Sequence, residues 1–318
     1  MSKKIGLIAT GGTIAGVQAP DMQSYTAGTM PISSLLSALP FDAAHIVPIQ
    51  LANIDSCDMD ADLWFALVRV VDAALVDMDG IVITHGTDTL EESAFLLQLL
   101  VRTHKPVVLT GANRPSNALG ADGLRNLYNA LCIACSERAH GVLVTMNDSI
   151  FAPTDCVKAT TLGADCFAAR NGALGYVQQG AVYFLRTESR KLPHFSARSP
   201  ESFARVEILL SYAHNGLGAI LRALKEDGVR GIVIAGSGAG NVHSALKRAL
   251  CAYQPDELTV VCASRLARSF IAPAMLQVPQ WIAAGYLSPF SARILLALLL
   301  GSGATHDAIV RTFRQFGD

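Results

Sequence analysis

Short apolar runs rich in β-branched residues alternate with helical patterns along the first half of the chain. The apolar runs are IGLIAT (5–10), DGIVIT (79–84), PVVLT (106–110) and GVLVT (141–145). Between them, hydrophobic residues recur every three or four positions in DLWFALVRVVDAAL (62–75), EESAFLLQLLVR (91–102) and DGLRNLYNALCIAC (122–135). Runs of the first kind predict buried strands, and patterns of the second kind predict helices. Their alternation predicts a parallel sheet covered by helices.

A second series of strands and helices follows a polar, basic and proline-containing stretch at residues 186–200. Its apolar runs are RVEILLSYA (205–213), GIVIAG (231–236) and LTVVCAS (258–264), and SPFSARILLALLL (288–300) is taken as the final helix. We therefore predict an α/β protein of two α/β domains. The larger N-terminal domain (1–188) has a parallel-rich sheet flanked by helices, a linker covers 189–203, and a smaller C-terminal domain (204–318) has a parallel sheet.

Composition excludes several classes of protein. With 318 residues and 51% hydrophobic content, the chain can bury a large core without disulfides or a structural metal. The net charge of −1 favours neither nucleic acid nor an anionic membrane as a partner. The most apolar stretch, Ile294 to Leu300, is far shorter than the ~20 residues that cross a bilayer. We therefore expect a small-molecule partner, with no nucleic acid and no membrane.

The N-terminus and the cysteines both predict a cytoplasmic protein. In MSKKIGLIATGGTIAG (1–16) the apolar run is interrupted by Gly6 and soon reaches a polar turn, which favours a first strand over a signal peptide. Seven cysteines, an odd number spread along the chain, fit reduced thiols better than a disulfide framework. Cys132 and Cys135 form a CxxC inside a helical pattern, which favours a buried helix over a redox or zinc site.

Polar residues follow each of the four strands of the first half. GGT follows the first strand, HGTD the second, GANRP the third and MND the fourth. In open parallel sheets, ligands bind outside the carboxyl ends of the strands. We therefore expect these four loops to lie along one edge and to converge on one site.

Thr13 and Thr87 are the candidate nucleophiles in these loops. A threonine hydroxyl is a weak nucleophile until a neighbouring group takes its proton. Candidates for that group are Tyr25, His85, Asp88 and Lys158. Periodicity alone does not place Lys158 in the site.

Helix capping is the alternative interpretation of the same loop. Asp88 with Glu91, and Thr89 with Glu92, have the spacing of a capping box ahead of an apolar helix. The two interpretations are compatible. A helix that starts just after Thr87 would point free backbone N–H groups at a carboxylate or a developing oxyanion.

Signals for cofactors and metals are weak. GGTIAG (11–16) lacks the ending of a P-loop, and GSGAG (236–240) is only part of a dinucleotide fingerprint. Glycines directly flank Ser237, whereas a nucleophile elbow needs them two residues away. The histidines show no paired spacing. We predict no cofactor and no metal.

The chain resembles the bacterial L-asparaginases and glutaminase-asparaginases of the two-domain, threonine-nucleophile type. ATGGTIAG (9–16) and ITHGTDTLEESA (83–94) resemble the two signature motifs of that family. Supporting matches are NIDSCDM (53–59), GANRPSNALGADGLRNLYNA (111–130), MND (146–148), SYA (211–213) and AGSGAGN (235–241). The resemblance runs from about Gly6 to the last predicted helix.

The resemblance implies a role for each catalytic candidate. Thr13 matches the nucleophile, and Tyr25, on a mobile lid after the first strand, matches its activating tyrosine. Thr87, Asp88 and Lys158 match a second triad in which the lysine assists proton transfer. The implied reaction converts L-asparagine to L-aspartate and ammonia through a threonine-linked acyl-enzyme.

The resemblance also implies substrate contacts and an assembly. Ser56 and Asp88 match the residues that hold the substrate α-carboxylate and α-amine, and Cys57 follows Ser56 in that loop. Ala112 matches a backbone contact to the side-chain amide, and Asn241 matches a residue from a neighbouring subunit. The family is typically a homotetramer of two intimate dimers, so closed symmetry is expected here.

Two departures from the family pattern leave the preferred amide open. Secreted members usually have glutamine or glutamate where this chain has Cys57, and a thiol is only a weak hydrogen-bonding group. Those members also supply a second-domain carboxylate to the substrate ammonium, whereas the stretch from Leu258 to His306 has neither Asp nor Glu. An ammonium that is removed from water needs a negatively charged partner. Binding of a free amino acid should therefore be weaker, unless neutral groups such as Gln277 bind its amine.

Two alternatives to L-asparagine hydrolysis follow from these departures. The first is a related amidase for L-glutamine, D-asparagine or an N-substituted amide. The second is a non-catalytic amino-acid-binding homologue, against which the joint presence of Thr13, Thr87 and Lys158 argues.

Overall fold

The computed structural model describes residues 2–21, 24–187, 192–214 and 217–317. Its contacts divide the chain into two compact units, Met1–His194 and Phe195–Asp318. The division falls within the predicted linker, 189–203, of which residues 189–191 lie outside the described part. Each unit combines helices with a sheet that is mostly or wholly parallel, which confirms the predicted α/β class.

Eight strands form the main sheet of the first unit, in the order β12-β11-β8-β7-β6-β5-β1-β4. The strands are β1 (Lys3–Gly11), β4 (Ala44–Ile54), β5 (Gly80–Thr84), β6 (Val107–Thr110), β7 (Val142–Met146), β8 (Ser149–Phe151), β11 (Gly175–Gln178) and β12 (Ala181–Phe184). The neighbours from β4 to β7 are parallel, and the remaining three strands extend the sheet with antiparallel pairing. Every residue of β5, β6 and β7 is buried, as expected for strands that are covered on both faces.

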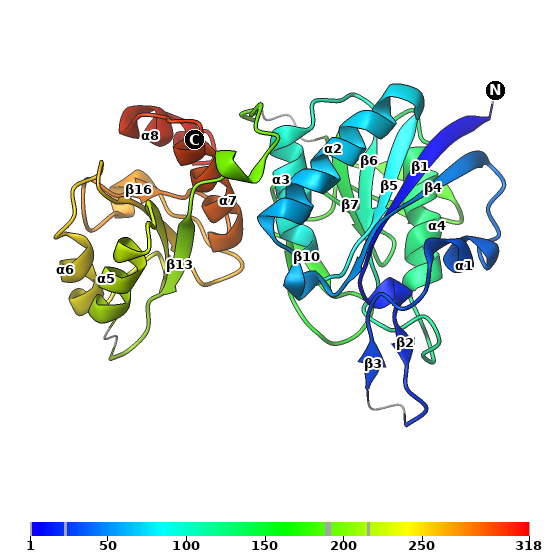
Figure 1. The fold of residues 1–318 in the computed structure, drawn as a ribbon, viewed down its shortest axis with the longest axis horizontal. Helices are drawn as coiled ribbons and strands as arrows, with labels where there is room; N and C mark the ends of the chain where they lie inside the picture. The colour runs from blue at the N-terminus through cyan, green and yellow to red at the C-terminus, as the bar shows by residue number, and fades with distance from the viewer. Residues whose placement is uncertain (1, 22–23, 188–191, 215–216, 318) are drawn as a thin grey trace. The chain divides into compact units, whose positions relative to one another are not determined.

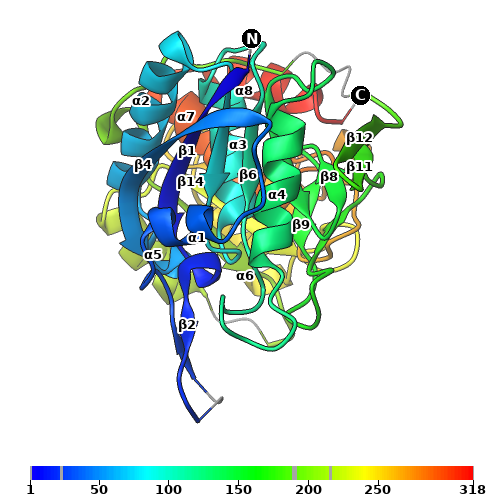
Figure 2. The ribbon, with the colours of Figure 1, turned by 90° about the vertical axis from the view of Figure 1, so that its right-hand side faces the viewer.

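Helices cover both faces of this sheet (Figures 1 and 2). They are α1 (Ile32–Ser37), α2 (Ala61–Asp77), α3 (Leu90–Leu100) and α4 (Gly123–Ala134). Residues of α1 and α4 share one core cluster with Ile5, Leu7 and Val82 of the sheet. On the opposite face, α2 packs against β5 and α3 against β6 and β7. The predicted arrangement of a parallel-rich sheet between helices is therefore confirmed.

Two short hairpins stand near the carboxyl edge of the main sheet. One joins β2 (Val17–Gln18) to β3 (Tyr25–Thr26) and extends beyond that edge (Figure 1). The other joins β9 (Cys156–Lys158) to β10 (Phe167–Ala169). These hairpins bring Tyr25, twelve residues from Thr13, and Lys158, 71 residues from Thr87, onto structural elements next to the signature motifs.

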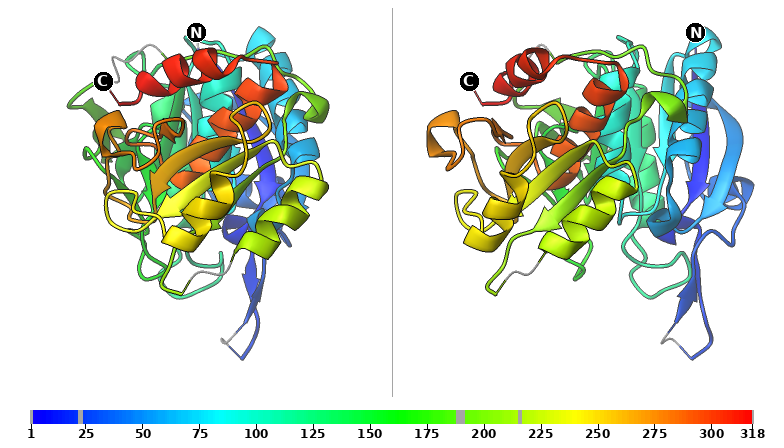
Figure 3. Two further views of the ribbon diagram at one scale, coloured as in Figure 1. Left: turned by 90° about the vertical axis from the view of Figure 1, so that its left-hand side faces the viewer. Right: turned by 60° about the vertical axis from the view of Figure 1, so that its left-hand side comes forward.

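The second unit holds a parallel sheet of four strands in the order β13-β14-β15-β16 (Figure 3). The strands are β13 (Val206–Leu210), β14 (Gly231–Gly236), β15 (Thr259–Ser264) and β16 (Ile282–Ala283). Helices α5 (Gly218–Glu226) and α6 (Ser244–Leu250) contribute to a core cluster with Ile232 and Ile234 of β14. On the other face, α7 (Pro289–Gly301) packs against β13, β14 and β15.

The chain does not end with α7 as the sequence analysis expected. A further helix, α8 (His306–Arg314), follows it and contacts β16. Only Ile309 and Phe313 of α8 are buried, and because the helix has nine residues, their spacing of four occurs only once. Among the described residues, none of the helices has both the length and the apolar character that a membrane crossing requires.

Candidate active site

The loops that follow β1, β4, β5 and β6 meet at the carboxyl edge of the main sheet, where these four strands are neighbours. Three glycines allow this approach. A Cβ on Gly12 would lie 2.4 Å from the Cα of Gly86, and one on Gly86 would lie 2.5 Å from the Oγ of Ser56. A Cβ on Gly111 would lie 2.5 Å from the carbonyl oxygen of His85. Any larger residue would therefore push the loops apart.

The first candidate nucleophile lies in the loop after β1. Gly11 (φ 109°) and Gly12 (φ 78°) turn the chain in a conformation that favours glycine, and Thr13 starts a short 3₁₀ turn. Its hydroxyl is 3.1 Å from the hydroxyl of Tyr25, close enough for a hydrogen bond in either direction. Thr13 is buried, whereas Tyr25 is 46% exposed on its hairpin.

The loop after β6 ties down the hairpin that carries Tyr25. The side-chain oxygen of Asn117 accepts from the backbone N–H of Gln18 (2.6 Å), and its amide nitrogen donates to the Gln18 carbonyl (3.1 Å). The neighbouring Ser116 donates its hydroxyl and its backbone N–H to the Gly16 carbonyl (2.7 and 3.0 Å). The sequence analysis missed Asn117, whose only signal was its place within the matching segment 111–130.

The second threonine forms a cluster with a lysine and an aspartate. The Nζ of Lys158 donates to the Oγ1 of Thr87 (2.8 Å) and to the Oδ1 of Asp88 (2.6 Å). The Lys158 side chain is 17% exposed and the Asp88 side chain 58%. Because the Thr87 oxygen accepts from an ammonium, its own proton can be donated elsewhere. The structure therefore brings together the three residues that only the resemblance had associated.

The predicted capping boxes are absent. No side chain caps the N-terminus of α3. The Thr89 hydroxyl instead donates to the carbonyl oxygen of Ser56 (2.7 Å), and the Ser56 Oγ accepts from the backbone N–H of Asp88 (3.2 Å). These bonds join the loop after β4 to the loop after β5. The capping prediction was wrong because these side chains are used between loops rather than within one helix turn.

Glu91, expected only in a cap, connects α3 to β9, the strand that carries Lys158. Its Oε2 accepts from the backbone N–H of Lys158 at 2.5 Å. Burial raises the pKa of the Glu91 carboxyl to about 7, against the opposing effect of that hydrogen bond. The only sequence signal was a glutamate at the start of a helix that is otherwise almost entirely apolar.

His85 does not contact either threonine and is not the general base. It is fully buried, its Nδ1 is 2.7 Å from the Gly86 carbonyl, and its Nε2 is 2.9 Å from the Ser93 hydroxyl. Trp64 donates to the same hydroxyl at 2.8 Å. Burial lowers the pKa of His85 to about 4, so the ring is neutral. A neutral ring that donates to Gly86 and accepts from Ser93 satisfies both nitrogens and fixes the residue before Thr87.

The predicted substrate contacts have different surroundings. Ala112 is completely buried directly after β6. Cys57 is exposed beside Ser56, and the charge of Asp55 is the largest of several causes that raise its pKa, so the neutral thiol is the prevailing form. All seven cysteines are free.

Asn241, the predicted contact from a neighbouring subunit, lies in the second unit. Its side-chain oxygen accepts from Gln277 at 2.9 Å, and the oxygen of Gln277 accepts from Lys247 at 3.2 Å. Both of these bonds lie within the second unit, and the role of Asn241 stays a prediction.

The polar groups of the fourth predicted loop, MND (146–148), bond mainly to residues of α4. The loop forms the turn between β7 and β8, and its Asp148 pairs with Arg125 at 2.6 Å. Asn126 connects this turn to the loop after β6, since it accepts from the backbone N–H of Asn147 and donates to the Gly111 carbonyl. The loop lies beside the site, and its carboxylate is engaged.

Glu91 and His85 should have opposite effects on stability as a function of pH. Between about pH 4.5 and 6.5 the unfolded chain protonates His85 and ionises Glu91, whereas the folded chain does the reverse. The two contributions therefore cancel in the parent protein. Relative to the parent, Glu91→Gln should gain about 3 kcal/mol of unfolding free energy as the pH rises from 4.5 to 7, because only the parent's unfolded chain is stabilised by ionising a carboxyl that stays protonated in the folded chain.

His85→Gln is the matched control and should show the opposite trend. It should lose about 3 kcal/mol of unfolding free energy relative to the parent as the pH rises from 4 to 6.5. In the parent, His85 is protonated only in the unfolded chain over this range, so raising the pH removes that stabilisation of the unfolded chain; the variant has no such group. Denaturant unfolding at fixed protein concentration measures both differences. Differences that stay constant with pH would show that neither group titrates as its burial implies.

Comparisons with known proteins cover nearly the whole chain. The family model "Asparaginase, N-terminal" matches residues 4–190, and "Glutaminase/Asparaginase C-terminal domain" matches residues 205–313. A Haemophilus influenzae protein named "Probable L-asparaginase periplasmic" is 37% identical, with 98% of this chain and 93% of that protein covered. The "Glutaminase-asparaginase" of Acinetobacter glutaminasificans is 37% identical, with 95% and 96% covered. The crystal structure of the "Probable Cytoplasmic L-asparaginase from Campylobacter jejuni" superposes with a TM-score of 0.92, at 38% identity and with 98% and 99% covered.

Proposed function

Because this chain belongs to the asparaginase family, we propose that it is an amidohydrolase that converts L-asparagine to L-aspartate and ammonia. One observation carries the proposal: two hydroxyl groups with separate polar partners stand on loops that touch. Thr13 has Tyr25, and Thr87 has Lys158 and Asp88. The residues just before the two threonines, Gly12 and Gly86, are in direct contact. A module that only bound an amino acid would have no need of two such hydroxyls.

The proposed chemistry is a double displacement with Thr13 as the nucleophile. Its oxygen attacks the side-chain amide carbon, the C–N bond breaks, and ammonia leaves with the proton that the threonine gives up. Tyr25, at hydrogen-bonding distance, is the first relay for that proton. Water then cleaves the resulting β-aspartyl ester and restores the hydroxyl.

Thr87 and Lys158 assist both steps. The ammonium of Lys158 donates to the Thr87 oxygen and so stabilises negative charge that develops on it. The Thr87 proton is thereby directed toward the reacting atoms. Glu91 and His85 act only through backbone groups, by holding Lys158 and the residue before Thr87 in place.

Substrate recognition follows from the loop that contains Ser56. Lys158 binds the Oδ1 of Asp88, which leaves the second oxygen for the substrate α-ammonium. The Ser56 oxygen already accepts from a backbone N–H, so its proton suits the α-carboxylate. The backbone of Ala112 and the side chain of Asn241 complete the proposed set, the latter from a second copy of the chain.

Glutamine is the second candidate substrate, because relatives at 34–37% identity are named glutaminase-asparaginases. The side chain at position 57 is small and exposed, which leaves room near the substrate loop. Asparagine is favoured because relatives at 34–37% identity from four organisms are named as L-asparaginases without mention of glutamine.

The proposal also includes an assembly and a location: the protein forms a closed homotetramer of two intimate dimers, and it acts in the cytoplasm. Asp88 and Tyr25 are substantially exposed in a single chain, so a partner that covers them would strengthen their charge interactions by excluding water. The free cysteines and the name of the Campylobacter jejuni neighbour support a cytoplasmic location, although the Haemophilus influenzae relative is named periplasmic.

Ammonia release from L-asparagine, L-glutamine and D-asparagine tests the function. We expect turnover of L-asparagine with a high KM, because Asp88 is the only carboxylate available to the substrate ammonium within the proposed set. Initial rates over a wide range of substrate concentrations give kcat and KM separately. A protein that releases ammonia from none of the free amides, although folded and assembled, would refute the proposal.

A further inference from the structure

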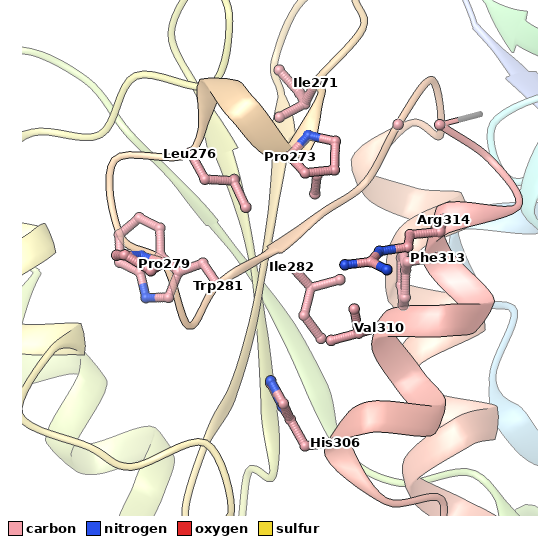
Figure 4. A pocket seen from close by; sticks show the side chains of 13 residues that line it. Ile271, Pro273, Leu276, Pro279, Trp281, Ile282, His306, Val310, Phe313 and Arg314 are labelled. Atoms are coloured by element: carbon pink, nitrogen blue, oxygen red, sulfur yellow. The ribbon is translucent and has the colours of Figure 1, made fainter.

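A second cavity lies wholly within the second unit, between α8 and the segment that contains β16 (Figure 4). Its volume is about 340 Å³, at the low end of the range for small-molecule sites. His306, Val310 and Arg314 line one wall, because residues four apart lie on the same side of a helix. Trp281 and Ile282 line the facing wall. Nothing in the proposed amidase chemistry uses this cavity.

Two basic side chains stand at different ends of the apolar lining. Figure 4 shows the Arg314 guanidinium turned over Ile282, and the imidazole of His306 entering from the other end. The Nδ1 of His306 is buried and has no hydrogen-bond partner among the described residues. A buried polar nitrogen without a partner costs about 1–3 kcal/mol, so a ligand that satisfies it gains affinity.

Among the residues that the structure describes, through Gly317, the lining contains no carboxylate to balance this charge. The absence is regional, since the whole stretch from Leu258 to His306 has neither Asp nor Glu. Asp307 follows His306 but is exposed and is not part of the lining. The cavity therefore favours an anion over a cation or a zwitterion, and in this it differs from the amino-acid site of the first unit.

The shape of the lining restricts the ligand further. Eight residues separate His306 from Arg314, which corresponds to about 12 Å along the helix axis. Between them the walls are formed by the side chains of Ile282 and Val310, which suit an apolar body. A guanidinium binds a carboxylate with two parallel hydrogen bonds.

We propose that this cavity binds a small aromatic monocarboxylate with a hydrogen-bonding group at its far end. Arg314 binds the carboxylate, the ring lies between Ile282 and Val310, and His306 bonds to the distal group through Nδ1. The site is separate from the amidase site and takes a ligand that the amidase does not hydrolyse.

Calorimetric titration of the assembled protein with 4-hydroxyphenylacetate tests the proposal. We expect saturable binding with a Kd of about 1 mM or tighter. The neutral analogue 2-(4-hydroxyphenyl)ethanol should bind at least tenfold more weakly, and this comparison needs no variant. Equal binding of the two compounds, or no saturation with 4-hydroxyphenylacetate, would overturn the proposal, as expected if another subunit or part of the chain fills the cavity.

Variants then assign the binding to this cavity. Arg314→Met should weaken 4-hydroxyphenylacetate binding at least tenfold, and His306→Phe should remove the preference for that compound over phenylacetate. Arg311→Met, an exposed arginine on the same helix outside the lining, is the matched control and should bind like the parent. Displacement by L-aspartate would mean that the compound occupies the amidase site instead.

Discussion

Replacing Thr13 with alanine should lower kcat for L-asparagine by at least about a thousandfold. The variant loses the oxygen that is proposed to form the β-aspartyl ester. The change removes the hydroxyl and one methyl group, and because Tyr25 is 46% exposed, its hydroxyl can bond to water instead, so the loop should be disturbed little. Steady-state ammonia release gives kcat, and burst-phase quenching shows whether a covalent intermediate forms.

Two further variants make this result specific to the hydroxyl. Thr13→Ser keeps the nucleophilic oxygen and should retain far more activity than the alanine variant. Thr26→Ala removes an exposed hydroxyl next to Tyr25 on the same hairpin and should leave kcat unchanged. If Thr13→Ala kept more than about a tenth of the parent kcat, Thr13 would not be the nucleophile, and Thr87 would become the first alternative.

Replacing Lys158 with methionine should lower kcat by about a hundredfold to a thousandfold. Methionine has a similar length, so the change removes chiefly the ammonium that binds Thr87 and Asp88. KM should change as well, since Asp88 would lose the cation that orients one of its oxygens. Lys225→Met is the control, because Lys225 donates to the carbonyl of Glu257 in the second unit.

A double variant distinguishes a catalytic unit from two independent groups. If Lys158 acts through Thr87, adding Thr87→Val to Lys158→Met should lower kcat by only a few fold more than the worse single change. Losses that multiply would mean that the lysine works without the threonine. In that case the contact between Nζ and Oγ1 would be structural.

The strands β1, β5, β6 and β7 could be predicted because each is a continuous apolar run, and α2, α3 and α4 because apolar residues recur along them. Strands β4, β8, β11 and β12 were not predicted, since β4 has no fully buried residue and the other three are short and not fully buried. The loops at the strand ends were also visible, since GGT and HGTD place unusual polar residues directly after buried strands. The helix α8 was missed because only two of its side chains reach the core. In a helix of nine residues their spacing of four occurs only once, which is too short a repeat to be recognised from the sequence.

The contacts of the site required the structure because they join residues far apart in sequence. Lys158 stands on a strand of three residues, too short to carry a period, and approaches Thr87 from 71 residues away. His85 was considered as a general base because the sequence does not reveal that its side chain is completely buried. Glu91 and Thr89 have capping spacing, yet longer-range acceptors and donors take their polar atoms.

The close contact of the loops at Gly12, Gly86 and Ser56 also decides where this enzyme can be re-engineered. Random mutagenesis at Gly12 or Gly86 should yield mostly inactive clones, because every side chain collides with backbone or with Ser56. Cys57 lies beside this contact but points its thiol to solvent. A library intended to change the preferred amide should therefore vary Cys57 and the hairpin between β2 and β3, and keep the glycines fixed.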